Sequence, residues 1–128
     1  MKNNYFIIAG FLNLITFFLH LIGGQLDLVN PMLNTSLSVE KSSQLVGAWN
    51  MVTIIIIATS YMLLMARFNK KYTTNKELLS FVTFLNVAFC FPFIIAGFYY
   101  GLLVPQWLFF LPIAILSFIG LKKIKQNA

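Results

Sequence analysis

Four stretches of the chain are each long enough to cross a lipid bilayer and contain no acidic residue, and this constrains the fold more than any other feature. They cover residues 5–23, 45–68, 78–100 and 102–121. A membrane-spanning helix needs about 20 mostly apolar residues, and it satisfies its backbone polar groups within its own segment. The sequence therefore predicts an all-α, integral membrane four-helix bundle formed by a single domain.

The composition agrees with this class. Of the 128 residues, 59% are hydrophobic and only 9% are charged, whereas a soluble domain carries about 25% charged residues. So few charges could not cover this much apolar surface in water. We therefore expect the lipid bilayer to be the first partner of the protein.

The distribution of basic residues predicts the orientation. Only Lys41 lies in the predicted outer loop at residues 24–44. The other eight bases lie near the termini or the predicted cytoplasmic loop at residues 69–77, and they are Lys2, Arg67, Lys70, Lys71, Lys76, Lys122, Lys123 and Lys125. The positive-inside rule then places both termini in the cytoplasm. Because the bases sit in short clusters beside apolar runs, we expect no nucleic-acid partner despite the net charge of +6.

Local signals add detail to the spans. Ser38, with Glu40 in the next turn, is a plausible start for the second helix. Pro92 should kink the third helix. The many Asn, Ile, Lys and Phe residues suit an AT-rich bacterial genome, so we predict a multi-pass protein of the bacterial cytoplasmic membrane.

Polar side chains inside the spans should face other helices, because exposing them to hydrocarbon is costly. If the first helix continues through the paired glycines, α-helical periodicity places Asn13, Thr16, His20, Gly24 and Asp27 on one stripe. In span two, Gly47, Asn50, Thr53 and Ser60 form another. Helix packing explains the deeper positions, Asn13, Thr16, Asn86 and Cys90. A second interpretation is a polar ligand pocket near the outer leaflet, with His20, Asp27, Gln44, Trp49, Asn50 and Thr53 as candidates.

The chemistry available to such a pocket is narrow. His20 is the one group that titrates near neutral pH, and Asp27 could orient it. No serine or cysteine is well placed as a nucleophile, and zinc requires three or four suitable ligands. We therefore predict no catalytic residue, no metal site and no cofactor.

These observations favour a non-catalytic accessory or interaction subunit, whose partners would be other membrane subunits or a second copy in a homodimer. One alternative is a small-molecule or ion transporter, although small multidrug exporters depend on a membrane carboxylate and no span contains one. Another is a membrane redox or metal-dependent enzyme subunit that uses His20.

The first half of the chain resembles a family of small bacterial four-span membrane proteins. The resemblance rests on a histidine shortly before paired glycines (His20, Gly23, Gly24), a proline-leucine stretch, and Trp49 and Thr53 at the start of span two. In that family a histidine follows the tryptophan, where this chain has Asn50. The resemblance implies no particular activity, but it implies that the outer ends of spans one and two meet.

Overall fold

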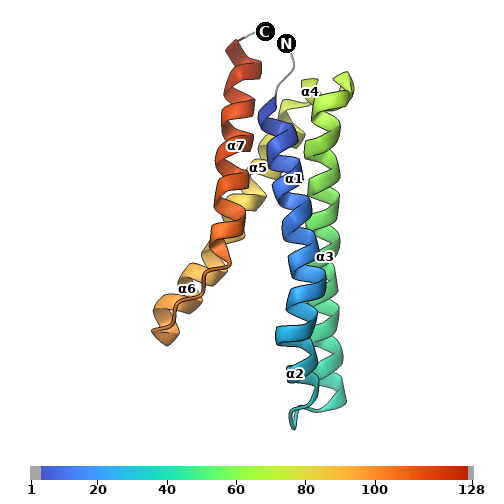
Figure 1. Cartoon of the computed structure of the whole chain (residues 1–128), viewed down its shortest axis with the longest axis vertical. Coiled ribbons are helices and arrows are strands. Elements are labelled where there is room, and N and C mark those ends of the chain that lie inside the picture. Colours follow the sequence, from blue (N-terminus) through green and yellow to red (C-terminus); the bar gives the residue numbers. More distant parts are fainter. Residues whose placement is uncertain (1–3, 127–128) are drawn as a thin grey trace.

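The computed structural model describes residues 4–126, and these form helices joined by short turns (Figure 1). In chain order the elements are α1 (Asn4–Phe18), η1 (Leu19–Val29), α2 (Asn30–Leu33), α3 (Val39–Phe68), α4 (Lys70–Thr74), α5 (Lys76–Ala88), α6 (Cys90–Tyr100) and α7 (Trp107–Gln126). Continuous helical segments long and apolar enough to cross a membrane are Asn4–Leu33, Val39–Phe68, Lys76–Tyr100 and Trp107–Ile124. The protein is therefore an all-α, multi-pass membrane protein with four spans.

The helices that contain the first two predicted spans extend beyond the limits of those spans. Residues 24–44 were expected to form an outer loop, but α1, η1 and α2 run without interruption to Leu33, and α3 begins at Val39. Only residues 34–38 connect them outside helices. The start of α3 agrees with the prediction, because the Ser38 side chain accepts a hydrogen bond from the Lys41 backbone N–H.

The third span bends where Pro92 predicts it. Proline has no N–H to donate to the carbonyl four residues earlier, at Ala88. Helix α5 ends at Ala88 and α6 begins at Cys90, with Phe89 between them. Gly101 then ends α6 with a positive φ of 64°, a conformation that favours glycine. A short turn leads from there into α7.

The helices have two distinct ends. We call the end that holds α4, the start of α1 and the end of α7 the basic end, and the opposite end, with α2 and the last turn of α6, the far end (Figure 1). At the basic end one apolar core joins α1, α3, α5 and α7. Its buried members are Phe6, Ala9, Leu63, Ala66, Leu79, Val82, Ile113 and Leu121.

Toward the far end the bundle separates into two pairs. A smaller cluster of Ile56, Cys90 and Phe110 lies where the pairs part. Beyond it, η1 and α2 lie along the first half of α3, whereas α6 packs against α7 and runs away from them (Figure 1). Each outer segment buries little: Val29 is the buried residue of η1, and Cys90 is that of α6.

Candidate functional site

His20 and Trp49 join the first span to the second near the far end. Their rings stack with centroids 3.8 Å apart and planes 13° from parallel. The His20 Nε2 atom also lies 3.5 Å from the Trp49 carbonyl oxygen, which accepts a hydrogen bond of 3.0 Å from the Thr53 hydroxyl. The structure therefore brings together three of the six residues predicted to line a ligand pocket.

Gly24 completes this junction. A Cβ atom built on Gly24 would lie 2.4 Å from the Trp49 indole, so only glycine leaves room for the ring. At Gly23 the same construction meets no atom within 4 Å. The two glycines, adjacent in sequence, therefore have different surroundings: Gly24 accommodates Trp49, and Gly23 faces open space.

Asp27 does not join His20, and the reason is the type of helix. Residues 19–29 form a π-helix, in which the Asn30 N–H donates to the Gln25 carbonyl five residues earlier. The seven residues from His20 to Asp27 make about two turns of an α-helix but only about 1.6 turns of a π-helix. His20, Gly24 and buried Val29 thus share a face, while Asp27 is exposed.

Gln44 and Asn50 do not take part in the contacts described for this junction. Both side chains are exposed, and the Asn50 amide donates a 2.9 Å hydrogen bond to the Val46 carbonyl of its own helix. The predicted stripe on span two is therefore divided: Thr53 and Ser60 are buried, whereas Gly47 and Asn50 are exposed. The described contacts at His20 form a helix junction that includes Trp49 and Thr53, whereas the side chains of Asp27, Gln44 and Asn50 are exposed.

The deeper polar residues lie inside the bundle. Asn13, Thr16, Asn86 and Cys90 are all buried. The Asn13 amide donates a 2.8 Å hydrogen bond across to the Thr59 hydroxyl of α3, whereas Asn86 bonds the Val82 carbonyl in its own helix. Sequence reasoning missed Thr59, because it lies off the face that Thr53 and Ser60 share.

One face of α3 carries a serine, a glycine, an asparagine and an isoleucine that are all exposed in the described chain. Ser43, Gly47, Asn50 and Ile54 are spaced by four, three and four residues, so they fall on one side of the helix. All four are exposed, and a Cβ built on Gly47 would meet no atom within 4 Å. We call these four residues the exposed α3 face.

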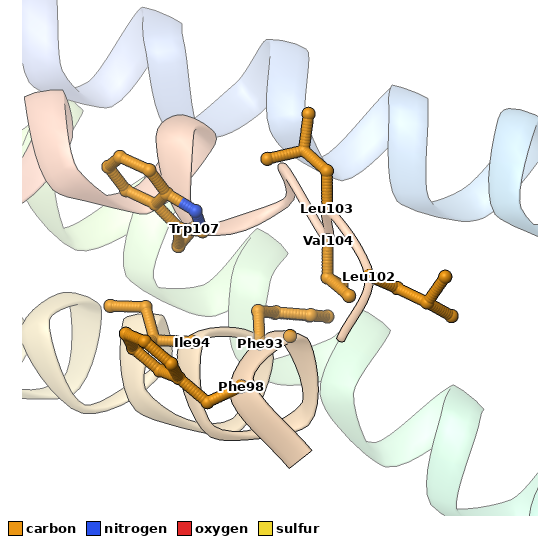
Figure 2. Close-up of a pocket in the computed structure, with 8 residues that line it drawn as sticks. Phe93, Ile94, Phe98, Leu102, Leu103, Val104 and Trp107 are labelled. Atoms are coloured by element: carbon orange, nitrogen blue, oxygen red, sulfur yellow. The ribbon is translucent and has the colours of Figure 1, made fainter. Parts of the chain in front are cut away.

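An apolar pocket of about 300 Å³ lies between α6 and the turn that follows it. Figure 2 shows Phe93, Ile94 and Phe98 of α6 on one side, and Leu103, Val104 and Trp107 on the other. Its lining offers no ionisable side chain. The pocket is thus suited to hydrocarbon and not to a polar substrate.

Among residues 4–126, no three His, Cys, Asp or Glu side chains lie close enough together to hold an ion. Comparisons with protein-family models, curated proteins and solved structures find no match. The class defined by the fold is therefore a small four-span membrane protein, and its function has to be argued from its own surfaces.

Proposed function

We propose that this protein is a non-catalytic interaction subunit of the membrane, and that the exposed α3 face binds another transmembrane helix. The observation that carries the proposal is the exposure of Gly47 and Asn50 inside a span. In lipid, small residues let helix backbones approach closely, and polar side chains usually face protein rather than hydrocarbon. Since no described segment of this chain covers that face, a second helix supplies the missing contact.

The chemistry of the face fits such a contact. An asparagine amide has two N–H donors and an acceptor oxygen. Asn50 can therefore keep its bond to the Val46 carbonyl and still bond a neighbouring helix. One turn away, the open space above Gly47 admits the backbone of that helix. Ile54 adds an apolar contact on the same side.

The proposal includes a location. The cluster of bases at one end supports an orientation with both termini in the cytoplasm. The resemblance to small bacterial four-span proteins supports the bacterial cytoplasmic membrane as its site. The partner helix belongs either to a second copy of this chain or to another membrane subunit, and the experiment below separates these two cases.

The test uses two glycines that both face open space. Gly47→Leu fills the exposed α3 face, whereas Gly23→Leu adds the same side chain to η1, and neither meets protein atoms close to the new Cβ. Each full-length variant is extracted from its natural membrane with a mild detergent, and native mass spectrometry gives the mass of the complex. We expect the wild type and Gly23→Leu to retain a partner in fixed stoichiometry and Gly47→Leu to lose it.

A second variant tests the amide. Asn50→Leu should weaken the association by about 0.6 kcal/mol, the average measured for a hydrogen bond between helices of a membrane protein. A complex of twice the chain mass identifies a homodimer, and a different mass identifies another subunit. A wild-type chain that is monomeric in mild detergent, or a Gly47→Leu complex that remains intact, would contradict the proposal.

A further inference from the structure

The basic end concentrates positive charge on three separate segments of the fold. The bases with described side chains at this end lie at the end of α3, on or beside α4, and at the end of α7. They are Arg67, Lys70, Lys71, Lys76, Lys122 and Lys123. Glu77 is the one acidic residue among the described residues there, since Asp27 and Glu40 lie toward the far end. A strong positive field therefore surrounds this end.

Aromatic rings hold several of these cations at the rim of the bundle. The Lys122 ammonium lies 4.7 Å from the centre of the Phe118 ring, and the Lys123 ammonium lies 4.5 Å from that of Tyr5. The Arg67 guanidinium carbon is 5.8 Å from the centre of the Phe68 ring. These distances fall within the range of cation–π attraction. Rings on α1, α3 and α7 thus place charges at the boundary between the apolar spans and water.

Helix α4 fixes two more charges at the same boundary. Asn69 lies between α3 and α4, and its side chain accepts a hydrogen bond from the Lys71 backbone N–H. The Thr73 hydroxyl donates to the Ala66 carbonyl, and Tyr72 packs against the core of the basic end. These contacts turn Tyr72 and Thr73 inward, so Lys70 and Lys71 remain exposed.

We propose that the basic end binds the headgroups of anionic phospholipids in the adjacent leaflet. The phosphodiester of such a lipid lies at the same boundary as these cations, and its negative charge complements them. Each basic residue close to an anionic membrane surface strengthens binding by about fivefold. The bases come from different helices, so the lipids bound there hold the ends of α3, α4 and α7 together.

The test compares two lipids in vesicles of phosphatidylcholine that contain the full chain. Spin-labelled phosphatidylglycerol and spin-labelled phosphatidylcholine are added separately, and electron paramagnetic resonance gives the association of each with the protein. We expect the anionic lipid to be favoured by about fivefold at low salt. The preference should fall in 1 M salt, where the Debye length is about 3 Å.

Matched variants locate the effect. Lys70→Gln, Lys71→Gln and Lys122→Gln together should reduce the preference, because they remove three of the six described bases at this end, and the three corresponding Arg substitutions should retain it. Lys41→Gln removes an exposed base near the far end and should change nothing. The proposal would be overturned if the two lipids associated equally with the wild type, or if free phosphate at equal concentration displaced the bound lipid. It would also be overturned if the Gln triple variant and Lys41→Gln lost the lipid preference to the same extent. None of these outcomes depends on the exposed α3 face.

Discussion

The basic end and the far end of the molecule are stabilised in different ways. At the basic end, side chains from four helices interlock around Phe6, which has no exposed surface. At the far end, each helix contacts mainly one neighbour, and the first two spans meet at the His20–Trp49 ring stack beside Gly24, with Val29 buried nearer the turn. Because lipid already surrounds apolar side chains, tight packing and not the removal of apolar surface from water distinguishes the two ends.

The largest expected difference is in the free energy of unfolding, when one phenylalanine from each end is replaced by alanine. Phe6→Ala should lower the free energy of unfolding by about 3 kcal/mol, because it leaves a cavity in the core and beside Gly120. Phe98, in α6, is 86% exposed, so Phe98→Ala should change that free energy by less than about 0.5 kcal/mol. Both are measured by sodium dodecyl sulfate titration in mixed micelles. Similar losses in the two variants would mean that the far end is as tightly packed as the basic end.

A smaller difference is expected between the adjacent glycines of η1. Gly24→Ala places a methyl group against the Trp49 ring and should destabilise the protein by about 1–3 kcal/mol. Gly23→Ala meets no neighbour and serves as the control for helix propensity. The same titration measures both, and Trp fluorescence should change only in Gly24→Ala. If both variants unfold like the wild type, close packing of Gly24 against Trp49 does not contribute to the stability of the protein.

The smallest expected effect concerns the hydrogen bond that the Asn13 side-chain amide donates to the Thr59 hydroxyl. A double-mutant cycle of Asn13→Ala and Thr59→Val should give a coupling of about 0.6 kcal/mol, the average for such bonds in a membrane protein. Thr16→Val supplies a control, since the Thr16 hydroxyl donates within its own helix to the Leu12 carbonyl. A coupling between Asn13 and Thr16 as large as that between Asn13 and Thr59 would contradict the geometry.

Much of this architecture followed from local patterns in the sequence. Hydropathy predicted the four spans, Ser38 predicted the start of α3, and Pro92 predicted the bend in the third span. The Ser38 and Pro92 signals each act over a few residues, and the spans are recognised from the length and apolar composition of each segment. They required no knowledge of which helices become neighbours.

The details of the candidate site required that knowledge. The stripe that grouped Asp27 with His20 assumed α-helical periodicity, and the π-helix rotates Asp27 away. The stripe that grouped Asn50 with Thr53 assumed that every polar residue of a span faces its own bundle. That rule concerns all protein in the membrane, including other chains, so it does not decide between the interior of this chain and a surface that binds a partner.

The short connections at the far end bear on how the chain enters a membrane. The turns at residues 34–38 and 101–106 contain no charged residue. In the proposed orientation these turns have to cross the hydrocarbon during insertion, together with the helix ends that flank them. Each pair of spans can therefore enter as a preformed helical hairpin without carrying a charged turn through the bilayer, and the charges near the far end are restricted to Asp27, Glu40 and Lys41 on the flanking helices.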